Sequence, residues 1–106
     1  MPLLDHEESE RLLRSEFRHL AVAPDTLFLL ESDDALRFIV AAKHKGLVVA
    51  GVEGFRHTSE GAYQPIQDFS NDNVGSSLTP EDFESQTMKL IESGKVDRIK
   101  FQVVFE

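Results

Sequence analysis

Residues 46–71 read GLVVAGVEGFRHTSEGAYQPIQDFSN, and this pattern predicts a β-hairpin. An apolar strand over residues 47–55 is followed by a polar, glycine-containing turn and by a second strand over residues 62–69. Two such runs separated by turn residues are typical of an antiparallel pair. Nothing in the segment pairs a nucleophile with a base, and nothing forms a phosphate-binding loop. The hairpin therefore points toward binding and away from catalysis.

Glycine and proline give this hairpin its distinctive pattern. Gly51 and Gly54 lie inside the first strand, and Pro65 lies inside the second. Glycine in a strand marks a bulge or a close approach of another backbone, and proline is confined to sheet edges and bulges. We expect Gly51, Glu53, Gly54, Phe55 and Pro65 to form one structural motif, in which a side chain at either glycine would crowd the neighbouring strand or force an unfavourable φ angle.

The rest of the chain supplies two further strands and three helices. The order α-β-α-β-β-α-β predicts a single α+β (or α/β) domain over residues 1–106, with one mixed four-stranded sheet and about three packed helices. We expect the first strand and the first hairpin strand to run parallel through a right-handed crossover. The elements outside the hairpin are a helix over residues 7–20, a strand over 26–31, a helix with Ser32 as its N-cap that ends at Gly46, a helix from Thr79-Pro80 to Gly94, and an alternating strand over 99–105.

Composition limits the class of protein. A chain of 106 residues with 41% apolar residues has room for one core. Its longest apolar runs, Leu27–Leu30 and Phe38–Ala42, are too short to cross a bilayer. It contains no cysteine, which removes disulfides and thiolate catalysis and agrees with a reducing compartment. The acidic N-terminal residues do not resemble a secretory signal. We expect a cytoplasmic protein that does not bind a membrane.

Acidic residues are unevenly distributed along the chain. The protein has 19 Asp and Glu against 11 Lys and Arg, for a formal net charge of −8, yet no Lys or Arg lies between Thr58 and Met88. Such a surface repels nucleic acid and attracts a basic protein. The alternative is that the acids only keep the protein soluble. We predict that the acids of this segment bind the partner: Glu60, Asp68, Asp72, Glu81, Asp82 and Glu84.

Two carboxylates on neighbouring hairpin strands are the best candidates for acid–base catalysis. Glu53 and Asp68 could form a pair that exchanges a proton with a substrate. The commoner outcome is a buried acid held by Arg37, by Arg56 or by backbone donors. The sequence therefore predicts no catalytic residues and no enzyme.

Metal binding has one candidate set of ligands. His57 could join Asp68 and Asp72, because imidazole and carboxylates are suitable ligands. A histidine in a polar turn is more often solvated, and we expect no metal site and no cofactor.

The hairpin and the residues around it resemble a known family. Gly51-Val52-Glu53-Gly54-Phe55, placed after a lysine-ended helix and Gly46 and followed by Pro65 and Asp68-Phe69-Ser70, resembles small bacterial immunity proteins of polymorphic toxin systems, including contact-dependent growth inhibition. The resemblance covers roughly residues 33 to 71. It implies a cytoplasmic, non-enzymatic protein that binds the C-terminal toxin domain of its cognate effector and covers the active site. Because such toxins are frequently nucleases, and hence basic, the acidic segment would then take the place of the phosphate-bearing substrate.

Three functions are therefore open at the level of sequence. The first is an inhibitor of a basic toxin domain. The second is a small-ligand or sensor domain that uses the 47–69 hairpin as a pocket wall. The third is a hydrolase that uses the carboxylates.

Overall fold

Four strands form one sheet in the order β1-β4-β2-β3. The computed structural model describes residues 5–73 and 77–106. Its elements are α1 (His6–Phe17), the short 3-10 helix η1 (Arg18–Leu20), β1 (Leu30–Glu31), α2 (Ser32–His44), β2 (Val49–His57), β3 (Tyr63–Asp72), α3 (Pro80–Ser93) and β4 (Lys100–Phe105). The α+β class, the four strands, the three helices and the predicted order of elements are confirmed.

The pairing within the sheet differs from the mixed sheet that the sequence predicts. β1 pairs with β4, β4 with β2, and β2 with β3, and all three pairs are antiparallel. β4 lies between β1 and β2, so these two strands run in the same direction without touching. The parallel direction expected for β1 and β2 is therefore present, with the last strand of the chain lying between them. Phe101 and Val103 of β4 are almost fully buried, which suits a strand with neighbours on both sides.

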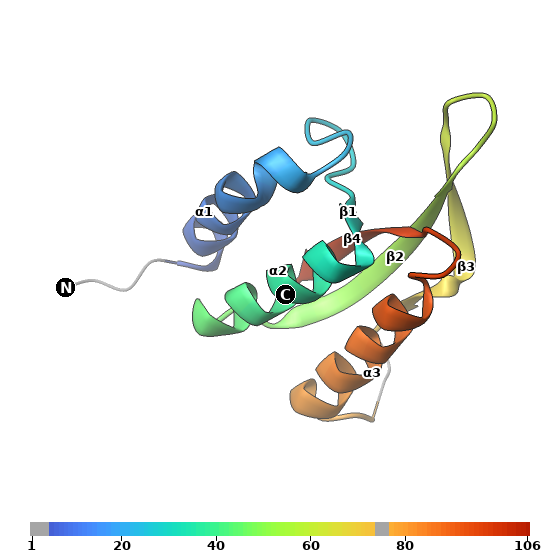
Figure 1. Ribbon diagram of the computed structural model, residues 1–106. Helices are drawn as coiled ribbons and strands as arrows, with labels where there is room; N and C mark the ends of the chain where they lie inside the picture. Colours follow the sequence, from blue (N-terminus) through green and yellow to red (C-terminus); the bar gives the residue numbers. More distant parts are fainter. Residues whose placement is uncertain (1–4, 74–76) are drawn as a thin grey trace.

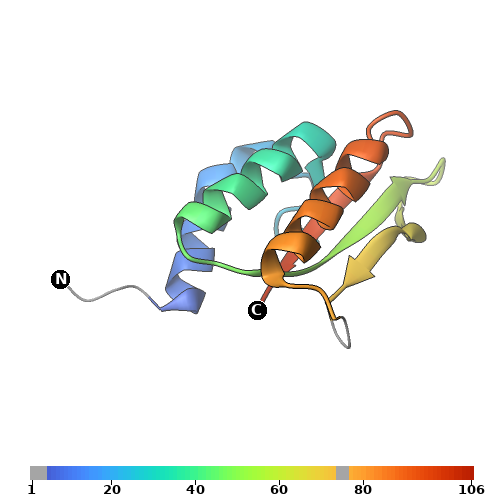
Figure 2. The same cartoon turned by 90° about the horizontal axis from the view of Figure 1, so that it is seen from below.

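Helices cover only one face of the sheet. α2 and α3 contact each other, α2 also contacts β4, and α3 contacts β2 and β3. Figures 1 and 2 show these two helices side by side on the sheet, with α1 packed against α2. On β4, Phe101, Val103 and Phe105 are buried, whereas Val104 between them is 47% exposed. The face that carries Val104 is open around this residue, whereas Phe55 of β2, which the alternation places on the same face, is buried.

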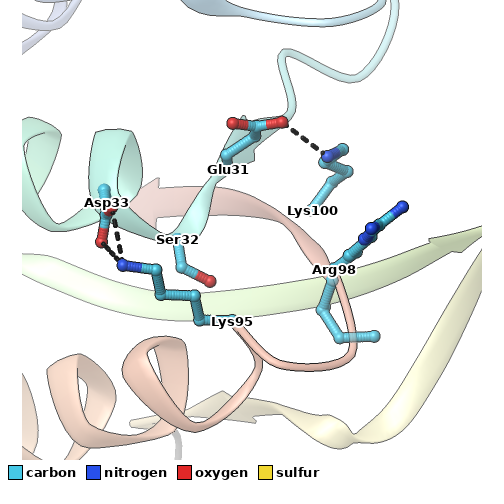
Figure 3. A pocket seen from close by; sticks show the side chains of 7 residues that line it. Glu31, Ser32, Asp33, Lys95, Arg98 and Lys100 are labelled. Atoms are coloured by element: carbon cyan, nitrogen blue, oxygen red, sulfur yellow. Dashed lines mark hydrogen bonds and ion pairs between the residues drawn. The ribbon is translucent and has the colours of Figure 1, made fainter.

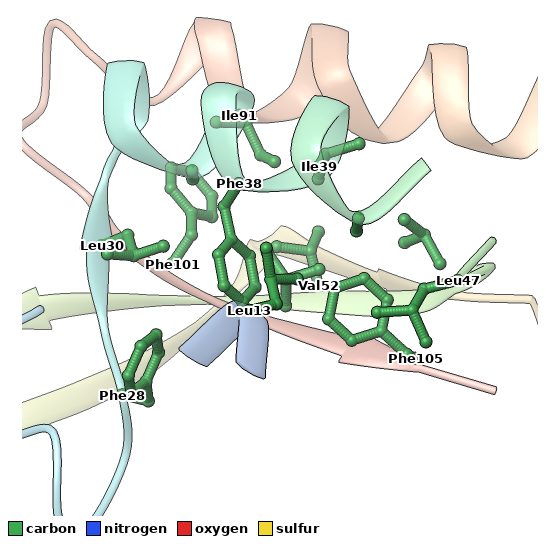
Figure 4. Close-up of a cluster of buried hydrophobic side chains, with 14 of the residues drawn as sticks. Leu13, Phe28, Leu30, Phe38, Ile39, Leu47, Val52, Ile91, Phe101 and Phe105 are labelled. Carbon is green, nitrogen blue, oxygen red and sulfur yellow. The ribbon is translucent and has the colours of Figure 1, made fainter. Parts of the chain in front are cut away.

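The core is centred on Phe38 of α2 (Figure 4). Its ring centroid lies 5.2 Å from Phe17, 5.8 Å from Phe28 and 5.6 Å from Phe105. These partners come from the end of α1, the segment before β1, and β4, so one side chain of α2 joins three distant parts of the chain. Aromatic pairs at such distances add roughly 0.5–1.5 kcal/mol each beyond the area that they bury.

The strand predicted over residues 26–31 is mostly a turn. Only Leu30 and Glu31 belong to β1. The backbone N–H groups of residues 26, 27 and 28 all donate to the carbonyl of Ala23, and both Ala23 and Phe28 adopt positive φ angles of 49° and 50°. Within this apolar run, Phe28, Leu29 and Leu30 are buried and Leu27 is half-buried. Its backbone, however, folds back on itself before it reaches the sheet.

The ends of α2 match the prediction at the C-terminus only. Gly46 has φ 78°, its N–H donates to Lys43, and the N–H of Leu47 donates to Ala42, both at 3.0 Å. This is the Schellman arrangement that a glycine in this place indicates. Ser32 is not the N-cap. It is the first helical residue, the N-cap is Glu31, and the Glu31 side chain makes no capping hydrogen bond.

The start of α3 is confirmed. Thr79 is the N-cap, and its Oγ1 accepts a hydrogen bond of 3.1 Å from the backbone N–H of Asp82. Pro80 follows at the first helical position, where its missing N–H has no cost. The helix ends near Gly94, whose φ of −80° is ordinary. There the reason for glycine is space, because a Cβ would lie 2.7 Å from the ring of Phe101.

A long bulge interrupts the pairing of β2 with β3. Val52 pairs with Asn71 and Gly54 pairs with Ile66, so the four residues 67–70 stand opposite Glu53 alone. Ser70 closes the bulge: its Oγ accepts from the N–H of Gly54 at 3.2 Å and donates to the carbonyl of Ile66 at 2.9 Å. The bulge bends the edge strand and changes the direction of the side chains that it carries.

Phe69 in the bulge packs against the core over Gly54. Its ring meets Phe101 edge-on, with 6.5 Å between centroids. A Cβ on Gly54 would lie 2.6 Å from the Cβ of Phe69 and 2.9 Å from Ile99. The expectation that Gly54 has no room for a side chain is therefore confirmed. The same holds for Gly51, where a Cβ would lie 2.7 Å from the carbonyl oxygen of Asn71.

Candidate functional site

The open face of the sheet carries a groove of about 630 Å³. The alternation of β2 places Gly51 and Glu53 on this face, opposite Val104 and Gln102 of β4. The groove lies over the middle of β2, and the bulge of β3 forms one wall. It is lined by Ala50, Gly51, Val52, Glu53, Pro65, Gln67, Ser70, Asn71, Asp72 and Val104. Because Gly51 has no side chain, the floor of the groove is backbone.

Glu53 is the central carboxylate of this groove. Its side chain is partly buried, and within residues 5–73 and 77–106 it has no hydrogen-bond or ion-pair partner. The sequence-based alternative that Arg37 or Arg56 holds it is wrong: Arg37 pairs with Asp34 on its own helix, and Arg56 pairs with no acid in the described residues. A partly buried carboxylate without a partner is ready to accept a hydrogen bond from a cationic group.

Asp72, and not Asp68, shares the groove with Glu53. Both Asp72 and Glu53 line it, whereas Asp68 points from the exposed part of the bulge and does not. The register explains this difference, because Asp72 pairs with Gly51 while Asp68 is one of the four bulge residues. The two acids that line the groove are thus Glu53 and Asp72, on the same two strands as the Glu53 and Asp68 that the sequence suggests.

The end of β3 and the start of α3 lie at the same end of the molecule (Figure 2). Asn71 and Thr87 join them, since the Asn71 Nδ2 donates to the Thr87 Oγ1 at 3.3 Å and Thr87 is fully buried. The bond links β3 to the middle of α3, and the exposed acids Glu81 and Asp82 in the first turn of α3 lie at the same end of the molecule as the exposed Asp72 at the end of β3. These three acids define what we call the acidic end.

The remaining predicted partner-binding residues differ in their surroundings. Asp68 is exposed in the bulge, next along β3 from the acidic end. Glu84 is partly buried on α3, and its Oε2 lies 3.9 Å from the Nζ of Lys43 on α2. Glu60 is exposed in the turn between β2 and β3, beyond the His57–Tyr63 pair. Glu60 is therefore separated from the acidic end by the length of the hairpin, and a single compact partner surface would not include it.

The structure does not bring His57, Asp68 and Asp72 together. His57 pairs with Tyr63 at the far end of the hairpin, with 4.9 Å between ring centroids, while Asp72 pairs with Gly51 at the other end. In the described part of the chain, no three His, Asp or Glu side chains are grouped so that they could hold a metal ion. The metal site considered from the sequence is therefore not formed by these residues.

Two groups of residues were missed by the sequence analysis. Gln67 and Val104 line the groove; the alternation of residues 99–105 marked Val104 as exposed, but gave no sign of what lay opposite it. The second group is basic: Arg56, Arg98 and Lys100 line a further pocket at the opposite end of the sheet from the acidic end. Their spacing in sequence gave no signal, because the sequence did not determine which strands are neighbours in the sheet.

Comparisons of the chain with models of protein families, with curated proteins and with solved structures found no match. Within the described ranges, no helix combines the length and apolar character needed to cross a bilayer. The fold and the site together define a small α+β domain with an open sheet face, a groove on that face and exposed acids at one end.

Proposed function

We propose that this protein is an immunity protein, which binds a basic toxin domain and covers its active site. One observation carries the proposal: exposed carboxylates gather at the acidic end, Asp68 lies nearby, and the segment from Thr58 to Met88 that supplies them contains no Lys or Arg. Because this segment carries no Lys or Arg, it does not repel a basic partner that approaches the surface. Complementary potentials of this kind raise the association rate and select the partner.

The groove extends the same surface onto the open face of the sheet. Glu53 at its centre would accept hydrogen bonds from an Arg or Lys of the toxin, and the stem of that side chain would pack on Gly51 and Val104. Glu53 is partly buried, so this contact would be less screened by salt than contacts at the exposed acids. In this proposal the acidic end sets the association rate and the groove slows dissociation. The protein acts by occupying the toxin's substrate site, and it performs no catalysis.

A titration against the basic protein encoded beside this one tests the proposal. We expect a 1:1 complex with a nanomolar dissociation constant, about −12 kcal/mol. Its association rate should fall steeply when salt rises from about 0.02 to 0.5 M, because the Debye length drops below about 5 Å. Calorimetry and stopped-flow fluorescence measure the two quantities. The absence of a complex on gel filtration, or an association rate that ignores salt, would contradict the proposal.

A small cationic ligand in the groove is the second candidate function. A groove of about 630 Å³ lined by the hairpin favours it, because ligand sites commonly have this size. Arginine methyl ester is a suitable probe, and it should raise the melting temperature of wild type but not of Glu53→Gln. Gln102→Glu, on the neighbouring strand, is the matched control and should strengthen the effect. If the probe leaves the melting temperature of every variant unchanged, this second function is excluded.

A further inference from the structure

A pocket of about 420 Å³ lies where α2 begins, at the end of the molecule opposite the acidic end. It is formed by the start of α2 together with the loop between α3 and β4. Three cations and two acids line it, so its side chains carry one net positive charge in a chain of net charge −8. The positive end of a helix adds roughly half a charge. The lining residues are Glu31, Ser32, Asp33, Lys95, Arg98, Ile99 and Lys100.

Ser32 supplies an unused polar group at this pocket. The residue is 4% exposed, and its Oγ is buried with no hydrogen-bond partner in the described part of the chain. Buried hydroxyls normally find a partner, so this hydroxyl is free to donate a hydrogen bond to a ligand or to an ordered water in the pocket. Figure 3 shows the hydroxyl between the side chains of Lys95 and Arg98. The first turn of α2 also lacks a side-chain cap, so its backbone N–H groups have no cap acceptor from Glu31.

Of the three basic residues around Ser32, two are paired with acids and one is not. The Nζ of Lys95 lies 2.9 Å from the Oδ2 of Asp33, and the Nζ of Lys100 lies 3.0 Å from the Oε1 of Glu31, so both form ion pairs. Arg98 is the third basic residue, and within residues 5–73 and 77–106 its guanidinium has no hydrogen-bond or ion-pair partner. Its backbone has φ 57°, a conformation that glycine adopts more easily, and such residues gather at ligand sites. Arg98 and Lys100 also line the adjoining pocket of about 510 Å³ that contains Arg56.

We propose that this pocket binds a phosphate dianion. The Arg98 guanidinium would donate two hydrogen bonds to it, the Ser32 hydroxyl a third, and the first N–H groups of α2 the others, as is usual for phosphates at helix N-termini. Lys95 and Lys100 would contribute charge while remaining paired with Asp33 and Glu31. The phosphate is either the free ion or the terminal group of a small monoester, whose remaining part would lie in the pocket beside Arg56.

Amide chemical shifts of the full-length protein test this site directly, with inorganic phosphate, adenosine monophosphate and adenosine as probes. In wild type we expect saturable shifts at Ser32, Asp33 and Arg98, with a dissociation constant of ~1 mM or below for a phosphate-bearing probe. Adenosine alone should produce none. Tighter binding of the monophosphate than of inorganic phosphate identifies a monoester as the ligand, and the reverse order identifies the free ion.

Three variants complete the experiment. Arg98→Gln should weaken binding about tenfold, whereas the matched control Arg11→Gln, an exposed arginine on α1, should leave it unchanged. Ser32→Ala should weaken binding several-fold and still melt at or above the wild-type temperature, since it removes an unpaired buried hydroxyl. The proposal is overturned if wild type shows no saturable shift up to about 10 mM probe. It is equally overturned if Arg11→Gln weakens binding as much as Arg98→Gln.

Discussion

Gly54→Val should destabilise the fold by about 3 kcal/mol, which is a large share of the 5–15 kcal/mol that a small domain has. The Cβ alone would lie 2.6 Å from the Cβ of Phe69 and 2.9 Å from the carbonyl oxygen of the same residue. Phe69 cannot move away easily, because the bulge that carries it is closed by Ser70, whose Oγ bonds to Gly54 itself. On the other side, Ile99 is part of the core.

Urea unfolding monitored by circular dichroism measures this cost. Gly61→Ala is the matched control, because Gly61 has φ 85° with nothing within 4 Å of an added Cβ. That substitution should cost only about 1 kcal/mol, from backbone strain. A smaller loss of stability for Gly54→Val than for Gly61→Ala would show that the bulge can move to make room for the side chain, and would contradict the prediction. If Gly54→Val had the melting temperature of wild type but no longer bound the partner, Gly54 would be a contact residue.

The local features of the chain could be predicted because each depends on a few neighbouring residues. Gly46 ends α2 through two backbone bonds within its own turn. Thr79 and Pro80 begin α3 in the same way, and Pro65 marks β3, which is an edge strand. These signals survive in the fold because no distant contact opposes them.

The sheet order could not be predicted because it depends on contacts between the two ends of the chain. β4 enters between β1 and β2 and pairs with both, so residues 30 and 101 become neighbours. The shortness of β1 could not be predicted either, for a more local reason. Ala23 and Phe28 adopt positive φ angles with no glycine to indicate them, and the packing of Phe28 against Phe38 compensates for the strain.

The candidate site was predicted in composition but not in arrangement. The sequence identified the acidic segment, yet the bulge removes Asp68 from the groove, and Asp72 lines the groove with Glu53 instead. Glu60 lies in the segment but at the other end of the hairpin. A four-residue bulge opposite a single residue has no sequence pattern of its own, because Gln67 to Ser70 would equally suit a regular strand.

The double variant Asp68→Lys/Glu81→Lys should weaken binding of the basic partner about 100-fold, corresponding to about 2.7 kcal/mol. Both side chains are exposed, so each replacement removes an attraction and adds a repulsion at the proposed interface. The fold should lose at most about 1 kcal/mol, mainly because Glu81 lies at the positive end of α3. We leave Asp72 and Glu84 unchanged, since Asp72 has interactions of its own and Glu84 lies near Lys43.

The control for this variant must carry the same change of net charge at a different place. Glu7→Lys/Glu92→Lys meets this condition, because Glu7 is on α1 and Glu92 is exposed at the end of α3 remote from the acidic end. Calorimetry gives the affinity, and rescue of growth in cells expressing the toxin gives the protective activity. If binding depends on total charge alone, both double variants will weaken it equally. Full rescue by Asp68→Lys/Glu81→Lys would remove the acidic surface from the mechanism and leave the groove around Glu53 as the site of contact.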